Sequence, residues 1–212
     1  MPDIQLIKIS PKSPDQYIQE IAKLHAEQLS VGLLTKMGIN FLKKLYFFVA
    51  SDSSAVLMVA IKNTRIVGFV CGAYDVDRFY KRFLFRYGYF VLWRLLVLLL
   101  ARPKIFFQTY NLKKYFLLNL SASNLPKAEL LSMVVKPDHL RQGIGRKLFI
   151  GLSKDFVEHN ICAFKVAASE TQKEAVCFYP SMGGRKIATT VLGQLKTSIY
   201  LINLQNSDFN HD

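Results

Sequence analysis

Residues 134–148 read V-V-K-P-D-H-L-R-Q-G-I-G-R-K-L, and these residue types in this order can hold a phosphate group. A β-branched run ends at Lys136, a polar turn follows, and Gly143–Gly145 opens a segment rich in Arg, Lys and Leu. This order is typical of a strand, a tight loop and a helix N-terminus, where free backbone N–H groups and the helix dipole attract anions. Two glycines let the backbone approach a ligand closely. We therefore predict a site for a phosphorylated ligand here.

Arg141, Arg146 and Lys147 would surround this ligand with positive charge. Two other phosphate-binding motifs do not fit the same residues. The loop lacks the third glycine of a Rossmann fingerprint, and the Walker A pattern is absent from the sequence. A lone glycine loop does not identify its ligand, so the ligand has to be inferred from the elements around the loop.

Strand and helix patterns alternate along the chain and predict one α/β (α+β) domain over residues 1–212, built around a single sheet. A hairpin turn is expected at residues 62–64, and Thr171 with Glu174 forms a candidate capping box. The predicted strands cover residues 4–9, 55–61, 65–73, 128–135, 163–168, 186–192 and 197–204. The predicted helices cover roughly residues 15–29, 33–50, 144–159 and 171–182.

The pieces on either side of the loop resemble the GNAT family of N-acetyltransferases. The strand A-E-L-L-S-M-V-V at 128–135, with Pro137 and then R-Q-G-I-G at 141–145, is similar to the core motif of that family. Downstream, E-A-V-C-F-Y at 174–179, followed by Gly183 and Gly184, resembles the A-x-x-F-Y-x-x-x-G segment of that family. The resemblance covers most of the chain in element order and residues 128–184 in motif detail.

This resemblance implies a mixed, mostly antiparallel sheet flanked by helices. It also implies acetyl transfer from acetyl-CoA to the primary amine of a small acceptor, without a metal. The pantetheine arm would pair with the fourth strand and the pyrophosphate would bind the glycine loop. The residues that this carries over to the coenzyme are Met133, Val134, Val135, Leu140, Arg141, Gln142, Gly143, Ile144, Gly145, Arg146 and Gln172.

Two side chains receive catalytic roles from the resemblance. Glu129 begins the fourth strand, where some family members carry a carboxylate general base; the alternative is a solvated strand-end residue. Tyr179 matches the general acid that protonates the departing thiolate, and the alternative is an amphipathic core tyrosine. The oxyanion donor is expected to be a backbone N–H near Val134 or Val135. Cys177 is expected to be a buried small hydrophobe.

The chain departs from the family pattern at two positions. Leu140 stands where Gln or Arg is usual, and Arg141 follows one position later. Gln172 stands where the family often has Asn. Both departures shift the expected coenzyme contacts from side chains toward backbone amides.

The net charge of +13 is concentrated in one part of the chain. Residues 78–128 contain ten Lys or Arg and no Asp or Glu, which favours an anionic partner. Nucleic acid is the weakest candidate, because this block is too apolar and has no binding motif. Three cysteines without a metal-ligand spacing, and an N-terminus unlike a secretory leader, favour a cytoplasmic protein.

A basic, apolar helical insertion is predicted between the third and fourth strands, at about 78–118. Its apolar run at 88–101 is interrupted by Arg94 and falls short of the roughly 20 residues of a spanning helix. A substrate-side lid, a homodimer contact and peripheral contact with the inner face of the membrane through 79–118 remain open. Residues 65–72 and 77–82 resemble GNAT proteins of bacterial surface-polysaccharide biosynthesis, which implies a nucleotide- or lipid-linked amino sugar as acceptor.

Two other functions remain open on sequence alone. A long-chain N-acyltransferase acting on an amino acid would use the Leu-rich insertion to hold the acyl chain. A non-catalytic, membrane-docked acyl-CoA sensor would account for the loop and the insertion, but the matches to the family at Glu129 and Tyr179 would then be coincidental.

Overall fold

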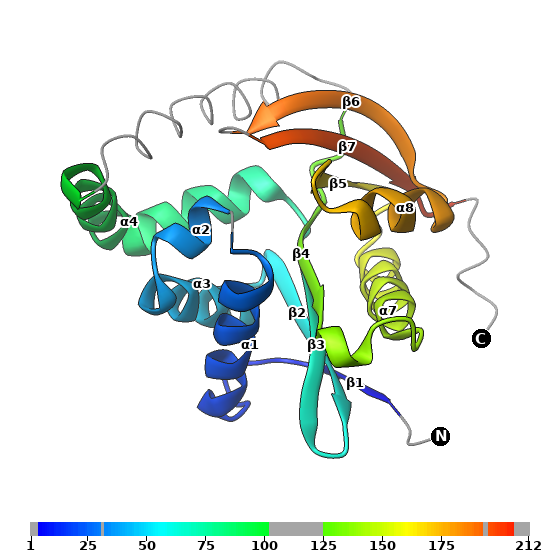
Figure 1. Ribbon diagram of the computed structural model, residues 1–212, viewed down its shortest axis with the longest axis horizontal. Coiled ribbons are helices and arrows are strands. Elements are labelled where there is room, and N and C mark those ends of the chain that lie inside the picture. The colour runs from blue at the N-terminus through cyan, green and yellow to red at the C-terminus, as the bar shows by residue number, and fades with distance from the viewer. Residues whose placement is uncertain (1–3, 31, 102–124, 193–194, 206–212) are drawn as a thin grey trace.

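The chain folds into one seven-stranded sheet with helices on both faces (Figure 1). This computed structural model describes residues 4–30, 32–101, 125–192 and 195–205. The strand order is β1-β2-β3-β4-β5-β7-β6, and every neighbouring pair is antiparallel except β4 and β5. The predicted single α/β domain with a mixed, mostly antiparallel sheet is confirmed. In chain order the described elements are β1 (Gln5–Lys8), α1 (Asp15–Gln28), α2 (Leu33–Lys36), α3 (Ile39–Ser51), β2 (Ala55–Lys62), β3 (Arg65–Ala73), α4 (Val76–Ala101), β4 (Glu129–Val135), the 3-10 helix η1 (Pro137–His139), α7 (Ile144–Glu158), β5 (Ala163–Ser169), α8 (Lys173–Ser181), β6 (Arg185–Leu192) and β7 (Leu195–Asn203).

The two faces of the sheet carry separate hydrophobic cores. On one face α1, α3 and the first half of α4 pack over β2 and β3, with Tyr46, Phe69 and Phe79 fully buried between them. On the other face α7 and α8 pack over the sheet around Phe149 and Phe164. Figure 1 shows the two helical layers on opposite sides of the strands. The site described below lies where β4 and β5 meet between these layers.

The predicted hairpin at residues 62–64 is present between β2 and β3. Asn63 and Thr64 both have positive φ angles, of 49° and 65°, as a tight two-residue hairpin turn requires. The strand register runs from Lys62 opposite Arg65 to Ala55 opposite Ala73.

The helix predicted over 33–50 is wrong as a single element, because it is broken into α2 and α3 at Gly38. Gly38 has a φ of +92°, which ends the helical path and leaves the Met37 carbonyl able to accept hydrogen bonds from another element. Arg94 of α4 donates hydrogen bonds to this carbonyl from Nε at 2.8 Å and from Nη2. The break therefore creates a docking point for α4.

The helical insertion between β3 and β4 is confirmed, and α4 is longer than predicted. It begins at Val76 and continues without interruption through Arg94 to Ala101, so the expectation of a run too short to span a membrane is wrong for this helix. By length and composition alone, Val76–Leu100 is sufficient to cross a bilayer. The rest of the predicted insertion, up to residue 118, lies outside the described residues.

The capping box predicted at Thr171 and Glu174 is absent, because α8 begins later, at Lys173, without a side-chain cap. The Thr171 hydroxyl instead hydrogen-bonds Ser169 Oγ at 2.8 Å. That bond holds the turn between β5 and α8.

Candidate functional site

The adjacent strands β4 and β5 pair over only two positions and then separate. Glu129 lies opposite Lys165 and Leu130 opposite Val166, and the ladder ends there. β4 continues to pair with β3 as far as Val135, while β5 continues to pair with β7 as far as Ser169. A wedge therefore opens in the middle of the sheet, and the glycine loop follows the open end of β4.

The open edge of β4 presents backbone groups toward this wedge. Lys136 N–H donates to the Val67 carbonyl, and antiparallel ladders alternate, so the N–H of Val134 is directed to β3. The N–H and C=O groups of Met133 and Val135 accordingly point to the β5 side. Of the two candidate oxyanion donors, this geometry favours Val135.

A register shift marks the inner end of the same edge. Cys71 pairs with Ser132 and Gly72 with Leu130, so Leu131 has no opposite residue. Such bulges bend a strand and redirect its backbone groups, and they are frequent beside active sites. Here the bulge lies just beyond the last paired residue of β4 and β5.

The loop after β4 has the backbone shape predicted for an anion site. Arg141 and Gly143 both adopt left-handed conformations, with φ of 58° and 76°, and α7 begins at Ile144. The first helical hydrogen bond runs from Lys147 N–H to the Gly143 carbonyl, so the preceding amides of α7 have no partner within the helix. Successive N–H groups in this arrangement make a concave anion site. The Ile144 side chain is buried, which leaves only its backbone to a ligand.

Side-chain hydrogen bonds fix the position of the loop. Gln142 Nε2 donates to the Asp138 carbonyl at 3.2 Å, and Lys62 Nζ donates to Gln142 Oε1 at 3.0 Å. Gln142 thus ties the loop to the β2–β3 hairpin. Leu140 and Arg141 are exposed, so Arg141 is placed to add charge where Leu140 cannot.

Gly145 lies where the loop, β4 and α8 meet. A Cβ at this position would lie 3.7 Å from Phe178 Cε2 and 3.9 Å from Val135 Cγ2. Arg146 extends from the next position to α8, with Nη1 at 3.8 Å from Met182 Sδ. Gln172 is half-buried at the start of α8. Gly145, Val135 and Phe178 thus come together at the open end of the wedge, and we call this place its mouth.

Replacing Gly145 by Val is expected to raise the Kd for acetyl-CoA about tenfold or more, because two methyl groups would narrow this mouth. The fold should tolerate the change, since the contacts of a Cβ are ordinary and Val favours a helix more than Gly does. Calorimetric titration with acetyl-CoA measures the effect, with Gly145→Ala as the milder control and the melting temperature as the check on folding. An unchanged Kd in Gly145→Val would place the ligand elsewhere.

Glu129 is not a solvated strand-end residue, because its side chain is buried at the closed end of the wedge. Lys165 Nζ lies 3.8 Å from Glu129 Oε2, and both side chains are at most 8% exposed. Tyr80 of α4 lies close by, and burial together with the negative charge of Glu129 raises the pKa of its phenol well above the usual value. A carboxylate, an ammonium and a phenol therefore meet on the face that α4 covers.

Tyr179 lies on the opposite face, in the core formed by α7 and α8. Its ring packs at 6.3 Å from Phe149 and 5.8 Å from Tyr200, measured between centroids. Burial raises the pKa of Tyr179 well above the ordinary value, so its hydroxyl stays protonated at neutral pH. The residue can donate a proton but not accept one under these conditions.

Cys177 of α8 is exposed, so the expectation that it is buried is wrong. The phase of α8 directs Tyr179 into the core and leaves Cys177 toward solvent. His25 is buried in α1, where its Nδ1 forms a hydrogen bond with the Tyr46 hydroxyl at 2.5 Å. Burial lowers the pKa of His25 to about 4, so it is neutral at pH 7.

No role was predicted from the sequence for Lys165, Tyr80, Tyr46 or Ser132. Ser132 lies at the β4 bulge within hydrogen-bonding reach of Tyr46, which links the bulge to His25. Lys165 could have been found, because a lone Lys in the apolar strand 163–168 is buried only when it is paired. Tyr80 had no comparable signal.

Comparison with solved structures finds this fold in a set of acetyltransferases. An acetyltransferase of the GNAT family from Staphylococcus aureus is 16% identical, covers 95% of this chain and 99% of its own, and has a TM-score of 0.58. Arabidopsis thaliana NAA60 in complex with acetyl-CoA is 12% identical, with coverages of 96% and 100% and a TM-score of 0.60. A spermidine N-acetyltransferase SpeG chimera from Vibrio cholerae and hSSAT is 12% identical, with 99% of each chain covered and a TM-score of 0.60. No family model matches the sequence, and no match is found among curated proteins.

Proposed function

Because the chain has the fold of the GNAT acetyltransferases, we propose that it is an acetyl-CoA-dependent N-acetyltransferase acting on a primary amine. The observation that carries this proposal is the wedge between β4 and β5, with the unpaired β4 edge along one side and the glycine loop at its open end. A fold neighbour binds acetyl-CoA, which supports the same ligand here.

The residues around the wedge fit coenzyme A part by part. The amides at the start of α7, with the charges of Arg141 and Arg146, suit a pyrophosphate. The backbone groups of Met133 and Val135 suit the amides of a pantetheine arm, which can add to a strand edge as a peptide does. Gly145 keeps the passage between these two parts open. When bound, acetyl-CoA supplies a thioester whose carbonyl carbon an amine can attack.

Three groups of the chain would then divide the chemistry. Glu129 accepts the proton that the attacking ammonium must lose before its nitrogen bonds to carbon. A free backbone N–H on the open edge of β4 donates to the carbonyl oxygen as negative charge develops there. Tyr179 donates its hydroxyl proton to the sulfur as the carbon–sulfur bond breaks. Glu129 and Tyr179 come from opposite faces of the sheet, so the proton acceptor for the amine and the proton donor for the thiol are separate groups.

We further propose that the acceptor is a small amine with an anionic group, such as a nucleotide- or lipid-linked amino sugar. Support comes from the charge of residues 78–128, which have ten basic and no acidic side chains. The helix α4 brings part of that block to the Glu129 side of the wedge through Tyr80. Phosphates on the acceptor would meet these cations.

Release of free thiol from acetyl-CoA tests the proposal, with amino sugars, their nucleotide derivatives, amino acids and polyamines as acceptors. Acceptor-dependent release that saturates with acetyl-CoA is expected. Faster release from a long-chain acyl-CoA would favour the amino-acid acyltransferase instead. Tight acetyl-CoA binding with no release from any acceptor would favour the sensor and overturn the proposed activity.

A further inference from the structure

The helix α4 carries an apolar face that nothing in the described chain covers. Val76–Leu100 is long enough to cross a membrane, and only 11% of its most apolar stretch is buried. Phe85 is 96% exposed and Leu92 is 66% exposed. The spacing of the exposed residues by three and four places them on one side of the helix. They are Phe85, Tyr89, Leu92, Leu96 and Leu100, which together we call the α4 apolar face.

The opposite side of α4 is fixed to the domain. Phe79 and Phe83 are buried in the core, and Arg82 forms an ion pair with Asp52 at 2.8 Å. Further along, Arg94 donates to the Met37 carbonyl. A membrane-spanning arrangement would remove these groups from their partners, so the packing favours a helix that lies along a surface rather than across it.

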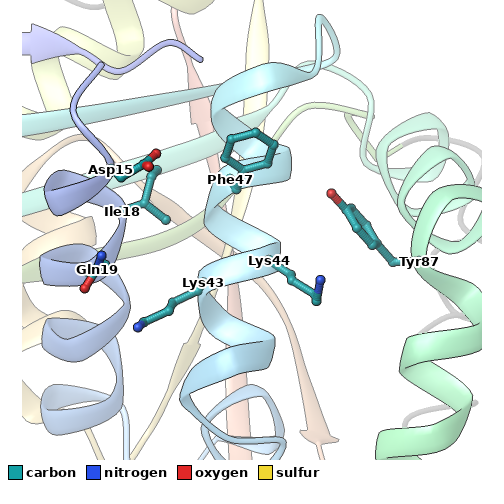
Figure 2. Close-up of a pocket in the computed structure, with 7 residues that line it drawn as sticks. All are labelled: Asp15, Ile18, Gln19, Lys43, Lys44, Phe47 and Tyr87. Carbon is teal, nitrogen blue, oxygen red and sulfur yellow. The ribbon is translucent and has the colours of Figure 1, made fainter. Parts of the chain in front are cut away.

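A second set of contacts joins α4 to α3. Lys44 Nζ lies 5.6 Å from the ring centre of Tyr87 and 5.1 Å from that of Phe90. Figure 2 shows Lys44 pointing from α3 toward Tyr87, at the edge of a hollow of about 380 Å³ that Lys43 also lines. None of the residues that line this hollow belongs to the wedge. The α3–α4 junction thus carries two lysines beside aromatic rings.

Basic side chains border the α4 apolar face at its N-terminal end. Arg78, Lys81 and Arg86 are exposed, and none of them forms a salt bridge within the described residues. After Asp77 the helix has no acidic residue. Aromatic and aliphatic residues beside unpaired cations are the composition of helices that bind in the plane of an anionic bilayer.

We propose that α4 docks this protein on an anionic phospholipid surface, with the α4 apolar face inserted at the headgroup boundary and the helix axis in the membrane plane. A second copy of the chain fits this face less well. A parallel two-fold contact would bring the basic ends of two helices together, and an antiparallel one would cover each basic end with the apolar C-terminal half of the other helix, in both cases without acidic partners. The inference goes beyond the proposed acetyl transfer and does not depend on it. Together, the two would place the enzyme peripherally at the inner face of the membrane.

The sole tryptophan of the chain, Trp93, is a built-in reporter, because it is 55% exposed at the border of this face. Adding vesicles of phosphatidylcholine with phosphatidylglycerol to the full-length protein should shift Trp93 emission to shorter wavelength, and the protein should sediment with them. Vesicles of phosphatidylcholine alone should bind at least about tenfold more weakly, and added salt should weaken the anionic binding.

The double variant Phe85→Glu, Leu92→Glu should lower the partition coefficient about tenfold or more, because it places charge on the apolar face without touching the core. Val157→Glu, on the exposed side of α7, is the matched control and should bind as the wild type does. Failure of the wild type to bind anionic vesicles would overturn the proposal. So would a wild-type dimer in solution that the double variant makes monomeric, which would identify the face as a contact between copies.

Discussion

Replacing Tyr179 by Phe is expected to lower kcat about 100-fold while leaving the Kd for acetyl-CoA within about twofold. The substitution removes only the hydroxyl that would protonate the leaving sulfur, and the ring keeps its contacts with Phe149 and Tyr200. Because burial raises the pKa of Tyr179, the wild-type hydroxyl remains a proton donor through the alkaline range in which an ordinary tyrosine ionises. The wild-type kcat should therefore not fall up to about pH 10 through loss of this proton.

Tyr200→Phe is the matched control for this experiment. Tyr200 is also buried in the core of α7 and α8, and its ring stacks obliquely on that of Tyr179. If the hydroxyl of Tyr179 acts in the reaction, only the Tyr179 variant should lose turnover in the thiol-release assay. Equal losses in both variants would assign the effect to packing, and full turnover in Tyr179→Phe would remove the residue from the acid role.

The parts of this fold that could be predicted are those that local residue order determines. The glycine loop followed from a β-branched run, Pro137 and two glycines within a few residues, and the structure has a helix beginning at Ile144. The β2–β3 hairpin followed in the same way from Asn63 and Thr64. Both features depend on backbone preferences of neighbouring residues, so the sequence is sufficient to predict them.

The wedge could not be predicted, because it depends on which distant strands pair and where the pairing ends. β4 and β5 are separated by the loop and α7, and their two-residue ladder is decided by the stronger pairing of each with its other neighbour. The break at Gly38 was missed for a similar reason. Its positive φ angle makes the Met37 carbonyl available to Arg94, which lies far along the chain.

The buried pair of Glu129 and Lys165 is the clearest case of a site that distant residues complete. From sequence, Glu129 could be either a general base or a solvated residue, and burial excludes the second reading. A different alternative to the general base remains, because a buried carboxylate beside a buried ammonium can act only to stabilise the fold. Mutation of Glu129 by itself cannot separate catalysis from stability, because it changes both.

Glu129→Gln is expected to lower kcat about 100-fold or more and to reduce the free energy of unfolding by about 3 kcal/mol, because Lys165 stays buried without its carboxylate. Lys165→Met alone should be destabilising for the corresponding reason, since it leaves the Glu129 carboxylate buried without its ammonium. Denaturant unfolding and the thiol-release assay measure the two effects independently.

The double variant Glu129→Gln, Lys165→Met separates them, because it removes both buried charges and keeps the volume of the side chains. Stability should return most of the way toward the wild type, since a buried ion pair and a well-packed neutral pair differ little in free energy. If Glu129 is the base, kcat stays low in the double variant although its stability has returned. If the pair only stabilises the closed end of the wedge, kcat recovers together with stability, and the proton acceptor must be sought among other groups on the α4 side.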